Sequence, residues 1–336
     1  MTTIKDVAKK AGVSVGTVSN VINNIDVVSE NTRKKVFKAI KELNFKPNII
    51  ARSLSKGKTN NIAIIVPEIN NPFFPELIRG ITDFLETKEY YAIIRNTDSS
   101  EKKEEIFIRD LNSLFVSGMI ITPTDAKGRN FQILSELKVP TVIVDREADT
   151  LKEDIVIVNN HKGAYEAVNY LISCGHKIII ILCGSKHTKT AQNRYIGWEN
   201  AMKENGLFNN DYIYWGDFTI DSGRKNMDEV LKKFKKVDAV FASNDIIAIG
   251  AMQAIRENGL RIPEDISIIG FDDISFSKLL NPPLTTIRQP VYEIGSMASE
   301  ILLKKIEGKN QQKNVCRYVL DGELIIRDSV AKKAGS

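Results

Sequence analysis

The chain contains few residues that could form disulfides or hold a metal. It has three cysteines and three histidines among 336 residues. Cys174, Cys183 and Cys316 are widely spaced and form no Cys-x-x-Cys pair. No two histidines have metal-ligand spacing, and we expect all three to be structural. This favours reduced thiols in a cytoplasmic protein, with neither a disulfide framework nor a bound metal.

Membrane, secretion and catalytic signals are also missing. No apolar run is long enough to span a bilayer, and the start of the chain is polar, unlike a signal peptide. The segment Gly57-Lys58-Thr59 resembles the end of a phosphate loop, but the first glycine of that motif would fall at Arg52. No nucleophile elbow is present. We therefore expect a soluble protein that is not an enzyme and that binds no cofactor.

The chain does have a concentration of positive charge near its start. Residues 1–60 carry twelve lysines and arginines against four acids, a net charge of +8, whereas the whole chain carries +5. The other 276 residues therefore sum to −3. A basic segment attached to a mildly acidic remainder is typical of phosphate binding by one part of a protein.

The same segment has the pattern of two short helices joined by a tight turn. Thr3 and Asp6 have capping-box spacing, and Gly12 stands where a left-handed residue would end the first helix. Ser14 can cap the second helix. Apolar residues recur at helical spacing in both, at Ile4, Val7, Ala8 and Ala11 and then at Val18, Val21 and Ile22. A helical hairpin without a nucleic-acid role remains the alternative at this point.

A third helix is expected from Ser29 to Leu43. Ser29 is its expected cap, and its apolar stripe is expected to contain Val36, Phe37, Ile40 and Leu43. Three amphipathic helices with a basic surface favour a helix-turn-helix domain, in which the second helix enters the major groove of DNA.

These residues carry a resemblance to a known family. The stretches IKDVAKKAGVSVGTVSNVIN, VSENTRKKV and PNIIARSL are similar to the DNA-binding end of the lactose/galactose-repressor (LacI/GalR) family. The resemblance implies a DNA-binding domain over residues 1–46. Base edges would be read by Val15, Gly16 and Asn20. The other expected DNA contacts are Thr3, Ser14, Thr17, Ser19, Asn23, Ser29, Thr32, Asn48, Ala51 and Leu54.

Residues 47–60 are expected to connect two domains. Pro47 stands at a helix-starting position, but the segment is too short to be a stable helix by itself. The resemblance implies a hinge helix that orders when two subunits pair in the minor groove, where Leu54 would wedge between base pairs.

From residue 61 onward, short β-branched runs alternate with amphipathic helical runs. The expected strands are 62–66, 91–96, 119–122, 141–144, 155–158, 178–182, 212–215, 239–242 and 266–270. The expected helices are 74–87, 102–115, 162–174, 195–205, 224–234 and 246–258. This alternation predicts an α/β fold with doubly wound parallel sheets.

Nine strands suit two similar halves better than one sheet. The resemblance implies a periplasmic-binding-protein-like core over residues 61–331. Its first lobe would contain about 61–159 and 289–319, and its second lobe about 160–288 and 320–331.

Ligands of such sheets bind beyond the carboxyl ends of the strands, so we searched the residues that follow each strand. The expected effector contacts are Asn71, Phe74, Asp98, Thr122, Asp145, Lys189, Arg194, Phe218, Asn244 and Asp272. For each polar residue, turn chemistry, helix capping or a salt bridge is the alternative role. For each phenylalanine, the alternative is packing in the core.

The sequence therefore predicts a DNA-binding transcriptional regulator, most simply a repressor of carbohydrate catabolic genes. Two subunits would bind a near-palindromic operator as a homodimer. The effector would be a sugar, sugar acid or sugar phosphate acting as inducer or co-repressor, and a protein co-regulator also fits the family. The last ten residues show no apolar heptad, which favours a dimer over a tetramer. The rival prediction is a solute-binding protein or sugar-handling enzyme that uses the same core.

Overall fold

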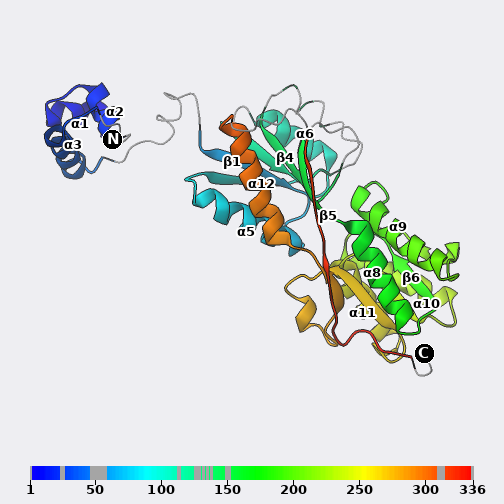
Figure 1. The fold of residues 1–336 in the computed structure, drawn as a ribbon. Helices are drawn as coiled ribbons and strands as arrows, with labels where there is room; N and C mark the ends of the chain where they lie inside the picture. The colour runs from blue at the N-terminus through cyan, green and yellow to red at the C-terminus, as the bar shows by residue number, and fades with distance from the viewer. Residues whose placement is uncertain are drawn as a thin grey trace. The chain divides into compact units, whose positions relative to one another are not determined.

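The computed structural model describes residues 2–22, 27–45, 59–111, 115–124, 130, 133, 136, 139–147, 153–308 and 315–333. Its Cα packing divides the chain into two units, Met1–Thr59 and Asn60–Ser336. Figure 1 shows helices in the first unit and two α/β lobes in the second. The domain limits expected from the sequence remain predictions.

The first unit contains α1 (Ile4–Ala11), α2 (Val15–Ile22) and α3 (Glu30–Glu42). The capping box at α1 is confirmed: the Thr3 hydroxyl accepts from the Asp6 amide, and the Thr3 amide donates to the Asp6 carboxylate at 2.8 Å. Gly12 ends α1 with φ of 67°, a left-handed conformation that glycine adopts without strain. Ser14 accepts the Thr17 amide at 3.0 Å, as expected of a cap.

A small apolar core holds these three helices together. It is formed by the buried side chains of Val7, Ala8, Val18, Val21, Val36 and Ala39. The expectation that Phe37 belongs to this core is wrong, because 51% of its surface is exposed. Ala39 is buried instead, three residues after Val36, which places the inner stripe of α3 one step away from Phe37.

The second unit begins with a lobe built on one six-stranded sheet. The strand order is β11-β5-β4-β3-β1-β2, and adjacent strands pair in parallel. The strands are β1 (Asn61–Val66), β2 (Tyr91–Asn96), β3 (Gly118–Ile121), β4 (Thr141–Val144), β5 (Asp154–Val158) and β11 (Arg317–Leu320). Helices α5 (Phe73–Glu86) and α12 (Val291–Ile306) share one apolar cluster with a face of this sheet, and α6 (Glu101–Asp110) shares the cluster on the other face.

The second lobe repeats this arrangement. Its sheet has the order β12-β10-β9-β8-β6-β7, in which only β12 is antiparallel to its neighbour. The strands are β6 (Ile179–Leu182), β7 (Ile213–Tyr214), β8 (Ala239–Ala242), β9 (Ser267–Asp272), β10 (Thr285–Arg288) and β12 (Glu323–Ile325). Helices α8 (Asn160–Ser173) and α9 (Lys189–Glu204) cover one face, and α10 (Ile220–Lys233) and α11 (Asp245–Glu257) cover the other. Short 3-10 turns occupy Asn210–Tyr212 and Ser277–Leu279.

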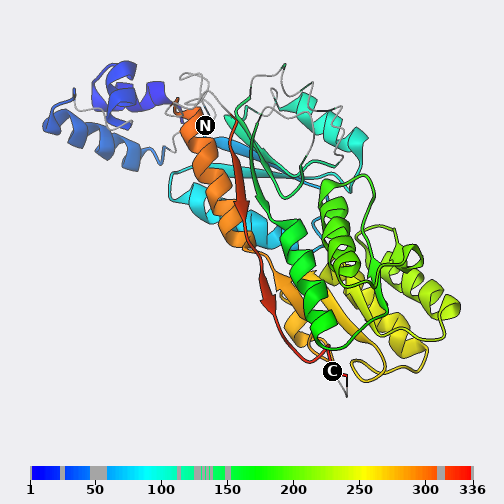
Figure 2. The same cartoon turned by 45° about the vertical axis from the view of Figure 1, so that its right-hand side comes forward.

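The chain passes between the two lobes three times. It crosses after β5, after β10 and between β11 and β12, and Figure 2 shows these crossings side by side. Parallel strands under helices on both faces confirm the predicted α/β class. Because these crossings are the covalent links between the lobes in the described part of the chain, they are where the two lobes can change their mutual angle. No helix in the described part of the chain is long and apolar enough to cross a membrane.

Candidate functional site

The second helix of the first unit exposes the residues that were expected to read DNA. Ser14, Val15 and Gly16 are exposed, and Thr17, Ser19 and Asn20 are half-buried, while Val18 and Val21 face the core. The Ser14 and Thr17 hydroxyls lie 2.9 Å apart. The helix therefore presents a row of short side chains to solvent, as entry into a major groove requires.

The structure gives less information about the other expected DNA contacts. Thr3 and Ser29 cap α1 and α3, and Thr32 shares a 2.9 Å hydroxyl contact with Ser29. The hinge and four of the expected contacts, namely Asn23, Asn48, Ala51 and Leu54, lie outside the described residues.

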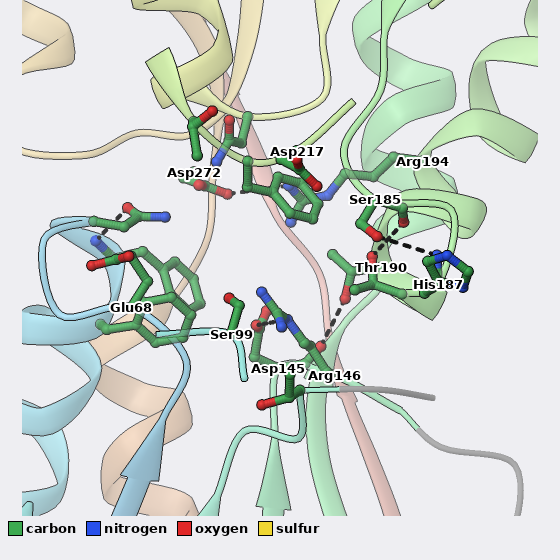
Figure 3. A pocket seen from close by; sticks show the side chains of 18 of the residues that line it. Glu68, Ser99, Asp145, Arg146, Ser185, His187, Thr190, Arg194, Asp217 and Asp272 are labelled. Carbon is green, nitrogen blue, oxygen red and sulfur yellow. Dashed lines mark hydrogen bonds and ion pairs between the residues drawn. The ribbon is translucent and has the colours of Figure 1, made fainter. Parts of the chain in front are cut away.

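A cleft of about 440 Å³ lies between the two lobes of the second unit. It is bounded by the loops that follow the carboxyl ends of the strands, and Figure 3 shows side chains entering it from both lobes. Its lining residues are Glu68, Asn71, Phe73, Phe74, Asp98, Ser99, Glu101, Thr124, Asp145, Arg146, Ser185, His187, Thr188, Thr190, Arg194, Asp217, Phe218, Thr219, Asn244, Asp272 and Gln289.

Eight of the ten expected effector contacts line this cleft. The two exceptions are Thr122, which is fully buried just after β3, and Lys189, which is the first residue of α9. Neither is among the lining residues, because the turn after β3 presents Thr124 and the first turn of α9 presents Thr190 instead. For the eight others, a role in binding an effector remains a prediction.

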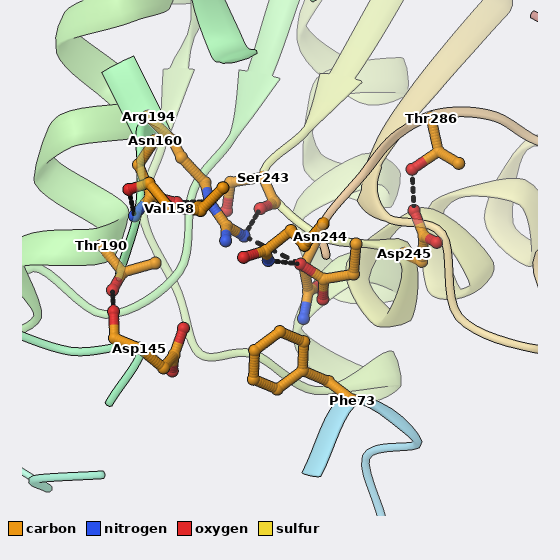
Figure 4. Close-up of polar contacts among 12 residues, drawn as sticks. Phe73, Asp145, Val158, Asn160, Thr190, Arg194, Ser243, Asn244, Asp245 and Thr286 are labelled. Atoms are coloured by element: carbon orange, nitrogen blue, oxygen red, sulfur yellow. Dashed lines mark hydrogen bonds and ion pairs between the residues drawn. The ribbon is translucent and has the colours of Figure 1, made fainter. Parts of the chain in front are cut away.

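Arg194 is the most completely buried charged side chain of the cleft, with 2% of its surface exposed. Its Nε donates to Asn160 at 2.7 Å, and its Nη1 donates to the Ser243 carbonyl at 2.5 Å and to Asp272 at 3.4 Å. Its guanidinium carbon lies 3.8 Å from the centre of the Phe271 ring. Figure 4 shows this network. The side chain is thus fixed before any ligand arrives.

Asp272 is an uncommonly placed carboxylate. Its backbone φ is 122°, which favours glycine, and its Oδ1 accepts from Gln289 at 2.7 Å. Burial, opposed by Arg194 and reinforced by Asp245 and Asp145, raises the pKa of Asp272 to about 8. A strained, buried carboxylate at a strand end is typical of a functional position.

Two contacts cross the cleft from one lobe to the other. The Thr190 hydroxyl of the second lobe donates to the Asp145 carbonyl of the first at 3.2 Å. The Arg146 guanidinium of the first lobe lies 5.9 Å from the ring centre of Phe218 in the second. Burial raises the pKa of Asp145 and lowers that of Arg146, which lie together as an ion pair at 3.8 Å.

The first-lobe wall depends on a residue that the sequence pattern did not reveal. Glu104 of α6 is buried, and its carboxylate accepts the Thr124 amide at 2.7 Å and the Asn130 side chain at 2.9 Å. Because α6 contains several acidic residues and looks solvated in sequence, no local pattern marks Glu104 as the buried acceptor. Arg146 was not predicted as a cleft residue, because its neighbour Asp145 had the stronger pattern. His187 was expected to be structural, but it lines the cleft.

The cleft combines charged side chains with aromatic surface. It is lined by six carboxylate side chains and two arginines. Phe73, Phe74 and Phe218 supply apolar surface beside them. Alternating donors and acceptors around aromatic rings match the two faces and the edge of a sugar ring. Among the described residues, no group of three or more histidine, cysteine, aspartate or glutamate side chains is arranged to hold a metal.

Two family models match the chain in the regions just described. Residues 3–48 match the model described as bacterial regulatory proteins, lacI family. Residues 168–330 match the model described as a periplasmic binding protein-like domain. The first match covers α1 to α3, and the second begins inside α8.

A full-length relative decides the family. The HTH-type transcriptional regulator RegA of Clostridium acetobutylicum is 42% identical over 332 residues, which cover 97% of this chain and 98% of RegA. The chain belongs to the lacI family of bacterial regulatory proteins. It is accordingly a DNA-binding transcriptional regulator, as its sequence predicted.

Solved structures of this family share the fold. A lac repressor dimer bound to operator and the anti-inducer ONPF aligns with a TM-score of 0.88 and 28% identity, covering 98% of this chain and 99% of the repressor. A complex of the regulator CelR with cellobiose aligns with a TM-score of 0.75 and 30% identity, covering 98% and 100%. The lacI-family likeness therefore extends over both units.

Proposed function

We propose that this lacI-family protein is a homodimeric repressor of carbohydrate genes whose operator affinity is set by a neutral sugar in the interlobe cleft. Two observations support it: the exposed polar face of α2 and the cleft lined by both lobes. A related structure is a lac repressor dimer bound to operator, and another holds cellobiose. The solute-binding or enzyme alternative is less favoured, because residues 3–48 match the regulator model.

On the DNA side, α2 would read the operator. Val15, Gly16 and Asn20 would contact base edges, while Ser14, Thr17 and Ser19 would hold phosphates. A dimer would place two such helices in successive major grooves of a near-palindromic site. The hinge would order in the minor groove, with Leu54 as its wedge.

On the effector side, the charge of the cleft narrows the ligand class. Six carboxylates and two arginines would repel a sugar phosphate or sugar acid more than they attract it. Asp272 keeps its proton at neutral pH because its pKa is raised to about 8. This lowers the negative charge of the cleft, but carboxylates still outnumber arginines. A neutral ring of hydroxyls meets no such penalty.

The link between the two sites would run through the contacts that cross the cleft. Thr190 and Asp145 join the lobes at one wall, and Arg146 and Phe218 face each other at another. A ligand that prefers one lobe angle shifts the population of that angle by its difference in affinity. Because the first unit is attached at the start of β1, a change of lobe angle in a dimer alters the spacing of the two DNA-binding units.

The test compares matched neutral and anionic sugars by thermal stabilisation of the full-length protein. Cellobiose, glucose and ribose are measured beside glucose 6-phosphate, ribose 5-phosphate and gluconate. We expect a neutral sugar to raise the melting temperature at concentrations where its charged counterpart does not, because binding to the native state stabilises it. Stabilisation by the phosphates alone would contradict the neutral-sugar assignment. A mobility shift on genomic fragments, with and without the stabilising sugar, then gives the sign of the response.

A further inference from the structure

A second concave site lies in the second lobe. It is an open groove of about 360 Å³ lined by Lys186, Gln192, Tyr195, Ile196 and Trp215. Gln192, Tyr195 and Ile196 are separated by three and four residues along α9 and so share one helix face. Arg194 and Thr190 of the same helix point instead into the cleft.

The groove and the cleft share two loops. In the loop before α9, Ser185 and His187 line the cleft, and Lys186 between them lines the groove. In the loop after β7, Trp215 lines the groove, and Phe218 lines the cleft.

The two loops between the groove and the cleft are tightly packed. A Cβ added to Gly184 would lie 2.3 Å from Phe218 Cζ, so the Phe218 ring is pressed against the backbone of the first loop. The Gln192 side chain donates to the Lys186 carbonyl at 2.7 Å and fixes that loop from the groove side. A ligand held in the groove therefore contacts the same two loops that wall the cleft.

The chemistry of the groove is opposite to that of the cleft. The Lys186 ammonium lies 5.3 Å from the centre of the Trp215 ring, and none of the ion pairs among the described residues includes it. The Tyr195 and Trp215 rings lie 5.4 Å apart at an angle of 49°. Burial and a hydrogen bond to Glu199 raise the pKa of Tyr195 to about 12, so its phenol is neutral. Aromatic surface beside one unpaired cation suits an anion that carries a ring.

We propose that this groove is a second binding site, for a small organic anion whose ring packs against Trp215 and whose carboxylate or phosphate pairs with Lys186. Such a ligand is of the class that the acidic cleft disfavours. The two sites would then select ligands by charge, with neutral sugars in the cleft and ring-bearing anions in the groove. The groove assignment does not depend on the effector assigned to the cleft.

The two tryptophans provide a direct measurement. Trp198 is fully buried, whereas Trp215 is half-buried in the groove. Full-length protein labelled with 5-fluorotryptophan gives two fluorine signals, and Trp215→Phe assigns them. The probes are phenyl phosphate and benzoate, with benzyl alcohol as the neutral ring. We expect both anions to shift the Trp215 signal saturably and to leave the Trp198 signal in place.

Two lysine variants separate the proposed contact from general charge. Lys186→Gln should weaken phenyl phosphate binding about tenfold, because a charge-assisted contact is lost. Benzyl alcohol should bind weakly and equally to both proteins. Lys203→Gln is the matched control, since the Lys203 ammonium also lies over a ring, 4.9 Å from the centre of Phe208, but is paired with Glu199.

Three outcomes would overturn the proposal. The first is the absence of a saturable Trp215 shift with either anion. The second is an equal loss of affinity in the Lys186 and Lys203 variants, which would indicate general electrostatics. The third is benzyl alcohol binding as tightly as phenyl phosphate, which would show an apolar site without anion selectivity.

Discussion

The α2 face and the interlobe cleft carry their functional side chains in opposite ways. On α2, Val15 and its neighbours are exposed, and the Ser14 hydroxyl bonds to Thr17, three residues along the chain. In the cleft, Arg194 is buried and bonded to partners 34, 49 and 78 residues away. We therefore expect substitutions on the exposed face of α2 to leave its fold intact, and substitution of Arg194 to destabilise the core.

Removing Arg194 should have the largest effect. Arg194→Ala removes the buried donor to Asn160, to the Ser243 carbonyl and to Asp272, and each buried acceptor left without a partner costs about 1–3 kcal/mol. We expect urea unfolding of the core to show a loss of this size. Arg256→Ala, an exposed arginine on α11, is the control and should change stability by less than about 0.5 kcal/mol. Similar losses in both variants would mean that the cleft is no more preorganised than the surface.

Exchanging Val15, Gly16 and Asn20 for the residues of another family member should change binding but not folding. The original operator should lose about 1–3 kcal/mol for each base pair that is no longer matched, and another operator should gain. The melting temperature of the first unit should stay the same. Competition binding against both operators measures the preference. A protein that keeps its original preference would show that other residues read the bases.

Protonation should distinguish the cleft from the surface. The pKa of Asp272 is raised to about 8 from an ordinary value of 3.8, so the folded protein holds a proton that the unfolded chain has released. Stability from this group therefore falls as pH rises from about 4 to 8, by up to about 1.4 kcal/mol per pH unit. Asp272→Asn should remove that fall, measured by urea unfolding across pH 5 to 9.

A surface aspartate supplies the control for this experiment. Hydrogen bonds from Arg261 lower the pKa of the exposed Asp265 to about 2. Its contribution is complete above about pH 4 and is lost only as pH falls further, so Asp265→Asn should run parallel to wild type between pH 5 and 9. If Asp272→Asn also runs parallel, the Asp272 carboxyl is ionised throughout, and its raised pKa is contradicted.

The smallest effect should come from the cap of α1. Thr3→Ala removes the hydroxyl that accepts the Asp6 amide and should destabilise the first unit by about 1 kcal/mol. Thr3→Ser keeps the hydroxyl and should retain most of the stability. Circular dichroism melts of both variants without DNA give the difference. Equal melts would show that the capping box contributes nothing to this unit.

Much of the architecture was predictable because local patterns determine it. The strands at 91–96, 141–144 and 239–242 agree with the predicted limits, since each is a clear apolar run. Strands β10 to β12 were not predicted, because β10 was taken for a crossing and β11 is half-exposed rather than continuously apolar. Phe37 was misplaced because a large apolar residue outweighed Ala39 in the pattern.

The site was predictable where strand ends determine it and unpredictable where distant partners do. Asp145 and Asn244 follow strands and Asp272 ends one, so their position at the cleft follows from sheet topology. Glu104 and Gln289 act through partners far along the chain, Thr124 in one case and Asp272 in the other. No local signal in the sequence marks such pairs.

The most direct test measures reciprocal coupling between the two regions. Operator affinity is titrated at increasing concentrations of the neutral sugar that stabilises the core, and sugar affinity is then titrated with and without operator. The proposed function predicts that each ligand changes the affinity of the other by the same factor, about 5- to 150-fold. A sugar that binds the cleft and leaves operator affinity unchanged would contradict the account.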